Sequence, residues 1–546
     1  MAVVWHDEAV RWRRAQTRIL AALTILVLGA AVWLVVATKK SDSDSARAAA
    51  PSGDPAVPTV HPAVPRATRS SPPADPGVPT LYASVGGQPT GPARPPGFLG
   101  LSIEYSALEA YAGANPAALD PVFVQLLRNL APAPGQPLVL RIGGNSTDAT
   151  WWPVKGVSPP AGVRYALTPT WLAETRALAA ALPAQLIMGV NLAAGLPRLA
   201  GAEAQAFMNG IGRSYLSAFE IGNEPDVYSL FRWYTGRHGP VFARSAGYGL
   251  SAFIAQVARW RAALPDVPLA GPAVAELPWM SGLSSLLRAE PSLRTVTVHR
   301  YALQGCLANR RSPSYPSVAN LLSDHAAHGL AAGIAPYVTA AHAQGAQFRV
   351  DELNSAALAG CLGRSGISST FASALWMVDA LFNLASVGVD GVNVHSLPGA
   401  GYELFTFRRT AAGWQAFVRP DYYGMLLFAQ GFPSGARLLP VRAPAGPVKI
   451  WATRASDGHT RVTLINKDSQ AHRVELQLPP STAQAEVQWL RAPSATAGSG
   501  VTLGGQSFGA ETGTGRLGAP QLQSVSQTFG SYAVELPADS AALVTR

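Results

Sequence analysis

Cysteine and acidic residues are both scarce in this chain. Its 546 residues include two cysteines, and 42 lysines and arginines outnumber 32 aspartates and glutamates, which gives a formal net charge of +10. Two thiols cannot complete a structural zinc site by themselves, because such a site usually takes four ligands. Cys306 and Cys361 are therefore expected to pair as a disulfide if the chain is exported to an oxidising compartment.

Signatures of nucleic-acid binding are also missing. The excess of basic residues favours an acidic partner, such as nucleic acid, an anionic membrane or an anionic glycan. However, the basic residues form no dense stripe interleaved with aromatic residues, and no zinc-finger spacing is present. We therefore expect no nucleic-acid partner, and much of the charge would serve solubility.

The amino-terminal region contains a long apolar segment. Residues 19–37 form an almost uninterrupted hydrophobic run that is long enough to span a bilayer. Four arginines precede the run and two lysines follow it, so the positive-inside rule places the amino terminus in the cytoplasm. A cleaved signal peptide is the alternative, because residues 46–48 (Ala-Arg-Ala) resemble a cleavage site. The protein would thus be membrane-anchored with the bulk of the chain outside the cytoplasm, or secreted.

Six segments are expected along the chain. They are a cytoplasmic tail (1–18), a transmembrane or signal anchor (19–38), a proline-rich linker (39–79), a strand that joins a later β-sandwich (80–97), a barrel (98–433) and the sandwich itself (434–546). The linker is too polar and too rich in proline to bury a core, so it should act as a semi-extended spacer.

Strand and helix patterns alternate through the fifth segment. The expected strands are 98–104, 138–142, 185–191, 217–221, 267–274, 295–298, 348–351 and 391–394. Asn115-Pro116 and Thr168-Pro169 indicate helix starts, since each places a proline after a capping residue. Eight β-then-α units in succession predict an α/β fold with a closed (β/α)8 TIM barrel.

The pattern changes after about residue 432, where helical spacing ends. Short alternating runs follow at 448–453, 461–466, 474–478, 486–490, 532–536 and 541–544, with turn residues between them. This pattern predicts a small antiparallel β-sandwich, to which residues 81–85 would add a strand.

Two glutamates follow the fourth and seventh predicted strands. Glu224 lies in Gly222-Asn223-Glu224-Pro225, where glycine and proline indicate a loop, and Glu352 follows residues 348–351. In a barrel both carboxyls would lie at the same rim. A partly desolvated carboxyl can hold a proton and act as a general acid, while an ionised partner acts as the nucleophile. Such a pair cleaves glycosidic bonds with retention of configuration, and we expect no metal and no organic cofactor.

Further polar residues are expected at the same rim. They are Glu104, Asn145, Asn223, His299, Tyr301 and His395, which end or follow predicted strands. A hydrogen bond from His299 or Tyr301 to Glu352 would keep that carboxyl ionised. Glu220 and Asp351 are expected to be structural ion-pair partners.

Several stretches resemble glycoside hydrolase family 79, the heparanase and β-glucuronidase family in the clan of retaining (β/α)8-barrel glycosidases. They are residues 98–104, 140–145 (Leu-Arg-Ile-Gly-Gly-Asn), 222–225 (Gly-Asn-Glu-Pro), 298–301 (Val-His-Arg-Tyr) and 421–424 (Asp-Tyr-Tyr-Gly). Asn-Glu-Pro marks the clan, whereas Arg-Ile-Gly-Gly is more specific to the family. The similarity extends over about residues 80–546.

The resemblance implies roles for individual residues. Glu224 would be the acid/base, Glu352 the nucleophile, and Glu104 an acceptor from hydroxyls of the sugar that is cleaved off. Gly401 and Tyr402 resemble the family's uronate-carboxylate site, in which backbone amides and a tyrosine hydroxyl donate hydrogen bonds.

The expected function is therefore that of an exo-β-glucuronidase acting on uronic-acid-bearing glycans or glycosides. Asn145 and Asn223 are further candidates for binding substrate. One alternative is another retaining glycosidase of the clan, of the xylanase, arabinofuranosidase or β-glucosidase type. The other is a non-catalytic carbohydrate-binding protein at the cell surface, against which the presence of both glutamates argues.

Overall fold

The computed structural model describes residues 77–131, 137–357, 365–479 and 483–546. Residues Val78–Cys306 and Arg311–Arg546 form one compact unit. The expected tail (1–18), the expected membrane segment (19–38) and nearly all of the linker (39–79) lie outside the described residues. Within the described ranges, no helix combines the length and apolar character that a bilayer crossing requires.

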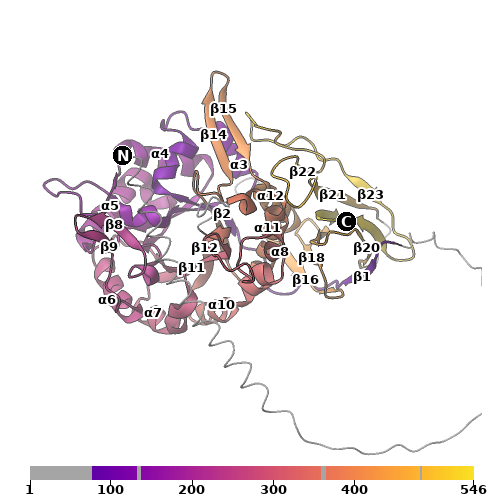
Figure 1. The fold of residues 1–546 in the computed structure, drawn as a ribbon, viewed down its shortest axis with the longest axis horizontal. Coiled ribbons are helices and arrows are strands. Elements are labelled where there is room, and N and C mark those ends of the chain that lie inside the picture. Colours follow the sequence, from indigo (N-terminus) through magenta and orange to yellow (C-terminus); the bar gives the residue numbers. More distant parts are fainter. Residues whose placement is uncertain (1–76, 132–136, 358–364, 480–482) are drawn as a thin grey trace, which may run out of the picture. The chain divides into compact units, whose positions relative to one another are not determined.

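Eight parallel strands close into a barrel (Figure 1). In chain order they are β2 (Leu99–Glu104), β3 (Val139–Gly143), β6 (Gln185–Val190), β7 (Leu216–Ile221), β10 (Leu269–Val274), β11 (Leu293–Gln304), β12 (Gln347–Ala357) and β13 (Gly391–Ser396). Strand β13 pairs with β2 and closes the barrel, with Val392 opposite Leu99. The structure thus confirms the (β/α)8 barrel, and it places the ends of β7 and β12 on one rim.

Helices surround these strands (Figure 1). The longer ones are α3 (Pro121–Arg128), α4 (Pro169–Ala181), α5 (Pro197–Phe207), α6 (Leu250–Arg261), α7 (Leu283–Ala289), α10 (Ala335–His342), α11 (Phe371–Ser386) and α12 (Pro420–Gly431). Helix α4 begins as expected, because the Thr168 side chain accepts from the Trp171 amide at 3.1 Å. The expected start at Asn115-Pro116 is wrong, since the Asp120 side chain caps α3 by accepting from the Val122 amide at 2.8 Å.

Strands β11 and β12 are longer than the sequence predicts. Their pairing continues past the barrel layer to Gln304 and Ala357, with an irregularity between Val298 and His299. Glu352 therefore lies inside β12 and not after its end, and Tyr301 lies inside β11. The extensions were not predicted because they contain polar residues, whereas a buried strand is recognised in a sequence by an apolar run.

Two hairpins at the rim were not predicted. Strands β8 (Arg232–Gly236) and β9 (Gly239–Phe242) follow β7, and β14 (Phe405–Thr410) and β15 (Gly413–Val418) follow β13. The short strands β4 (Thr150–Trp151) and β5 (Tyr165–Ala166) pair in the loop after β3.

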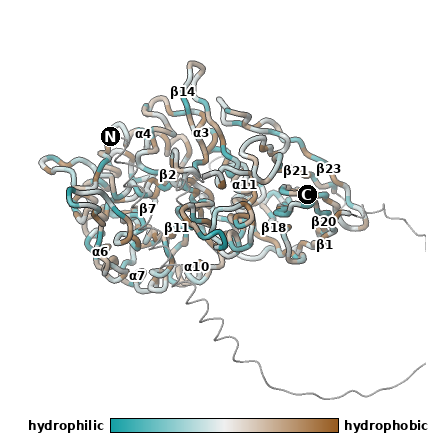
Figure 2. Tube along the Cα trace, viewed as in Figure 1, coloured by the Kyte–Doolittle hydropathy of each residue, from teal (hydrophilic) through white to brown (hydrophobic). Residues whose placement is uncertain are grey.

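The carboxy-terminal region folds into two further sheets. One has the order β17 (Val441–Arg442), β1 (Thr80–Val85), β20 (His472–Gln477) and β24 (Tyr532–Leu536). The other has the order β16 (Arg437–Leu439), β18 (Val448–Arg454), β19 (Thr460–Asn466), β25 (Ser540–Thr545), β21 (Ala485–Arg491) and β22 (Thr502–Leu503), with β23 (Gln523–Val525) beside β21. The pairing is antiparallel as expected, except that β1 runs parallel to β20. Apolar residues occur in the barrel and the sheets alike (Figure 2).

Helix α11 contributes to the contacts between the barrel and the carboxy-terminal sheets. The ring of Phe382 stacks on that of Trp451 in β18, with centroids 5.4 Å apart. Beside them, the buried Asp379 carboxylate pairs with the buried Lys467 ammonium and accepts from the Trp451 indole N–H at 3.0 Å. An ion pair out of water depends on its partner, because a lone buried charge costs several kcal/mol.

We expect Lys467→Met to destabilise the protein by roughly 3–5 kcal/mol, because it leaves the Asp379 charge buried and unpaired. The measurement is the urea midpoint of unfolding. Lys449→Met is the matched control: Lys449 pairs with Asp324 at 2.6 Å, but the Asp324 side chain is 66% exposed. That variant should lose less than about 1 kcal/mol. Equal midpoints for the two variants would contradict the interpretation.

Candidate active site

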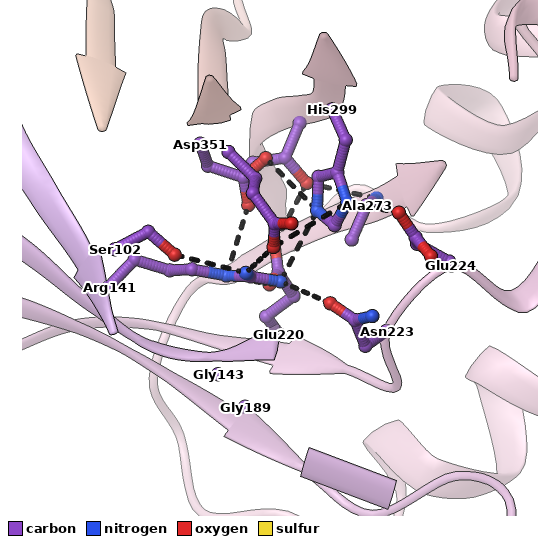
Figure 3. A network of polar contacts seen from close by, with 12 residues as sticks. Ser102, Arg141, Gly143, Gly189, Glu220, Asn223, Glu224, Ala273, His299 and Asp351 are labelled. Atoms are coloured by element: carbon purple, nitrogen blue, oxygen red, sulfur yellow. Dashed lines mark hydrogen bonds and ion pairs between the residues drawn. The ribbon is translucent and has the colours of Figure 1, made fainter. Parts of the chain in front are cut away.

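A buried arginine lies at the centre of the polar network (Figure 3). Arg141 in β3 is fully buried and donates to Glu352 at 2.8 Å, to Glu220 at 2.8 Å and to the Asn223 side chain at 2.8 Å. Asp351 lies 3.5 Å from its Nε. Glu220 and Asp351, which were expected to be ion-pair partners, thus both lie against Arg141. Arg141 was not among the expected site residues, although an arginine inside a buried strand indicates a paired charge.

The structure brings Glu224 and Glu352 together. One carboxylate oxygen of each, together with one ring nitrogen of His299, lie within 4.8 Å of one another. Carboxyls about 5–5.5 Å apart suit a retaining glycosidase, whereas an inverting enzyme needs about 6.5–9.5 Å to admit a water molecule. The separation therefore fits double displacement.

Glu352 is held as a carboxylate. Its Oε1 accepts from the Tyr301 hydroxyl at 2.5 Å, and its Oε2 accepts from Arg141. Burial would raise the pKa of Glu352, but the imidazoles of His395 and His299, the Arg141 guanidinium and the Tyr301 hydrogen bond together lower it well below its usual range. An ionised, hydrogen-bonded carboxylate of this kind is suited to nucleophilic attack.

Glu224 lies in the loop after β7 and is held differently. Its backbone has left-handed torsion angles (φ 51°, ψ 50°), and its amide donates to the Ala273 carbonyl at 2.9 Å. Pro225 disfavours the right-handed helical region for the residue before it, and the left-handed turn places the Glu224 side chain beside His299. The side chain is 22% exposed, in contrast to the 9% of Glu352.

His299 contacts Glu224, whereas the sequence predicted a contact with Glu352. Its Nδ1 lies 2.9 Å from Glu224 Oε1 and 3.8 Å from Glu352 Oε2, so the hydrogen bond expected with Glu352 is made with Glu224. Burial would lower the pKa of His299, but Glu352, the Glu224 hydrogen bond and Asp351 outweigh it and raise this pKa to about 9. Tyr301 alone makes the expected contact with Glu352.

Glu104 organises the loop after β3. Its two oxygens accept from the amides of Asn145 at 3.0 Å and Ser146 at 2.7 Å. A Cβ on Gly144 would lie 2.4 Å from Glu104 Oε1, so a side chain there would displace this carboxyl. Burial and the nearby Glu352 raise the pKa of Glu104 to about 7, although the hydrogen bonds from Ser146 lower it. Asn145 is exposed and accepts from the Asn223 amide group at 3.2 Å.

Tyr402 lies beside the two acids, whereas Gly401 is already engaged. The Tyr402 ring packs on those of Tyr301 and His395, with centroids 5.8 Å away in both cases. The Gly401 amide donates to Glu403 Oε2 at 3.0 Å, and Glu403 in turn pairs with an arginine. The Gly401 amide is thus engaged within the protein, and the Tyr402 side chain, which has a hydrogen bond with Tyr301, is the one that lies beside the carboxyls.

Two other expectations have different outcomes. His395 is buried, and its Nδ1 lies 2.9 Å from the Ser102 hydroxyl. Burial lowers the pKa of His395 to about 4, although Glu352 opposes the shift. Cys306 is disulfide-bonded, and Cys361 lies outside the described residues.

The spacing of Glu224, His299 and Glu352 would also let one metal ion reach all three. The Arg141 guanidinium and the Tyr301 hydroxyl already donate to the two Glu352 oxygens, however. A cation placed there would lie against a fixed positive charge, so the donor set suits an acid/base pair better than a metal centre.

The chain is similar in sequence to known glycoside hydrolases. Residues 450–543 match the family described as glycosyl hydrolase family 79 C-terminal beta domain. A β-glucuronidase of Neurospora crassa is 24% identical over 440 residues, which cover 70% of this chain and 74% of that protein. A β-glucuronidase of Aspergillus niger is 27% identical over 215 residues, which cover 34% of this chain and 39% of that protein.

Solved structures share the fold. A 4-O-α-L-rhamnosyl-β-D-glucuronidase from Fusarium oxysporum superposes with a TM-score of 0.66 at 21% identity, over 85% of this chain and 100% of that chain. A family 51 arabinofuranosidase from Xanthomonas axonopodis pv. citri gives a TM-score of 0.60 at 16% identity, over 85% of this chain and 99% of that chain. At these identities the likeness extends to the fold alone.

Proposed function

We propose that this chain, a glycoside hydrolase related to family 79, is a retaining exo-β-glucuronidase that removes terminal β-linked glucuronic acid from glycans or glycosides. The resemblance to family 79 that the sequence predicts is confirmed by the family match over residues 450–543 and by the β-glucuronidase relatives. The observation that carries the reaction is the pair of carboxyls within 4.8 Å in unlike environments.

In the first half of the reaction, a Glu352 oxygen attacks the anomeric carbon while Glu224 gives its proton to the glycosidic oxygen. The bond to the leaving group breaks, the alcohol departs, and the sugar remains as an ester of Glu352. Arg141 and Tyr301 hold the attacking carboxylate in place and keep it ionised until the bond forms.

In the second half, Glu224 is a carboxylate and acts as a general base. It takes a proton from water, whose oxygen attacks the anomeric carbon and releases Glu352. Each half inverts the anomeric centre, so the sugar leaves with its original configuration. Asn223 is fixed by Arg141 beside the acid and could donate to a substrate hydroxyl through its amide group.

The glucuronide preference rests on the position of Tyr402. Its ring lies against Tyr301 and His395 beside the nucleophile, and Asn354 holds its backbone carbonyl at 3.0 Å. A neutral hydroxyl there can donate to the sugar carboxylate without adding a charge to the site. The β-glucuronidase relatives support the same substrate class.

Glu352→Gln should lower kcat on the order of 10⁴–10⁶-fold while leaving ligand binding intact, because the nucleophile is lost. Glu224→Gln should lower it on the order of 10²–10⁴-fold, and least for leaving groups that need no proton. Steady-state kinetics with 4-nitrophenyl and alkyl glucuronides measure both effects, with the exposed Glu486→Gln as the matched control. A carbohydrate-binding protein without activity would be indifferent to both changes.

A panel of 4-nitrophenyl β-glycosides tests the sugar preference. We expect kcat/KM for the glucuronide to exceed that for the glucoside and galactoside. Tyr402→Phe should reduce this ratio by roughly 10- to 150-fold, since one hydrogen bond to a charged group is worth about 1.5–3 kcal/mol. Equal hydrolysis of neutral sugars by the wild-type protein would remove the uronate assignment and leave the glycosidase assignment in place.

We also propose that residues 19–38 anchor the protein in a membrane with the catalytic domain outside the cytoplasm. Support comes from the sequence, in the length of the apolar run and in the arginines before it. The full chain should stay in the pellet after alkaline carbonate extraction of membranes, whereas a chain that begins at Pro79 should be released. If the protein is instead recovered from the medium with its amino terminus removed, signal cleavage is favoured.

A further inference from the structure

His299 occupies a place that the proposed reaction does not yet use. It is 1% exposed and comes from β11, between the acid/base and the nucleophile. Its Nδ1 is 2.9 Å from Glu224 and 3.8 Å from Glu352, and its Nε2 is 3.7 Å from Asp351 (Figure 3). One ring therefore contacts or approaches three carboxyl groups.

Charge moves between two of these carboxyl groups during double displacement. The proposed reaction requires Glu352 to be the carboxylate and Glu224 to hold a proton in the free enzyme. In the glycosyl-enzyme Glu352 is a neutral ester and Glu224 is the carboxylate. The negative charge near Nδ1 thus moves from Glu352 to Glu224. The carboxyl group near Nε2, that of Asp351, takes no part in the reaction.

We propose that His299 is an imidazolium throughout the catalytic cycle and balances the negative charge in turn on Glu352 and on Glu224. This inference rests on the proposed function, because it takes the two glutamates as nucleophile and acid/base. His299 gives up neither proton. It is a positioning residue that stabilises both resting states and the charge transfer between them.

The surroundings of the ring agree with a lasting positive charge. The titratable groups that face it are Arg141 on β3, Glu220 on β7, Glu224 in the loop after β7, Asp351 and Glu352 on β12, and His395 on β13. The pKa values of Glu220 and Glu352 are lowered, so these two carboxyl groups carry negative charge, whereas burial and Glu220 raise the pKa of Asp351. Glu352, the hydrogen bond to Glu224 and Asp351 raise the pKa of His299 to about 9 in spite of burial and of Arg141, whose Nη2 lies 3.3 Å from Nε2.

The alternative is a neutral ring that only holds Glu224 by a hydrogen bond. A neutral imidazole would accept at one nitrogen, and Arg141 could donate to Nε2. The two cases differ in one measurable property, which is the protonation state at neutral pH. They differ also in the glycosyl-enzyme. A neutral ring that is bonded to Glu224 alone would be unaffected when Glu352 loses its charge.

The first experiment is nitrogen-15 NMR of imidazole-labelled full-length protein between pH 5 and 8, with His299→Gln to assign the signal. We expect imidazolium shifts for His299 in the free enzyme and in the enzyme trapped with 2-deoxy-2-fluoro-β-D-glucuronosyl fluoride. A neutral ring in either state overturns the proposal. If the reagent fails to esterify Glu352, the proposed function is wrong, while the free-enzyme spectrum still decides the charge of the ring.

The second experiment is kinetic. Gln at position 299 keeps a donor to Glu224 but removes the charge, so both half-reactions should slow by about 10²-fold, the usual cost of one preorganised electrostatic contact. Burst kinetics with 4-nitrophenyl glucuronide separate glycosylation from deglycosylation. His342→Gln is the matched control, because His342 is 42% exposed and pairs with Asp390 outside the site. A variant of His299 that slows one step and spares the other would contradict a role in both.

Discussion

The fully buried Arg141 guanidinium is the constraint on which the site depends. Transfer of an arginine into a barrel interior is costly, and the cost is offset here because Glu220, Asp351 and Glu352 approach it from two other strands. These contacts join β3, β7 and β12 through one charged group. The same group orients Asn223 and the carboxylate that would attack the sugar, so the contacts that join the barrel strands also position the site residues.

Much of the fold could be predicted from sequence, because barrel strands buried on both faces leave apolar runs of recognisable length. The start of α4 followed from Thr168-Pro169, whereas Asn115-Pro116 misled because the same pattern recurs five residues later at Asp120-Pro121, where the helix begins. The extensions of β11 and β12 and both rim hairpins escaped prediction. They are polar or mixed, and pairing with a neighbour, not the local pattern, makes them strands.

The pairing of Glu224 with Glu352 followed from strand order alone, since strand ends in a barrel share one rim. The finer contacts did not follow. Whether His299 bonds Glu224 or Glu352 depends on an irregularity between Val298 and His299 and on the left-handed turn at Glu224. Arg141 was passed over because it stands within an apolar strand, although that setting is what demands carboxylate partners.

Glu224 and Glu352 differ in exposure and in hydrogen-bond partners, because one lies on a loop and the other within a strand. Glu352 lies inside a strand and meets two donors, Arg141 and Tyr301, both held by strands of their own. Glu224 lies on a loop, is more exposed, and meets a single imidazole. A carboxyl on rigid backbone with fixed donors suits a nucleophile that must stay ionised, and a carboxyl at the rim suits an acid that must exchange its proton with water.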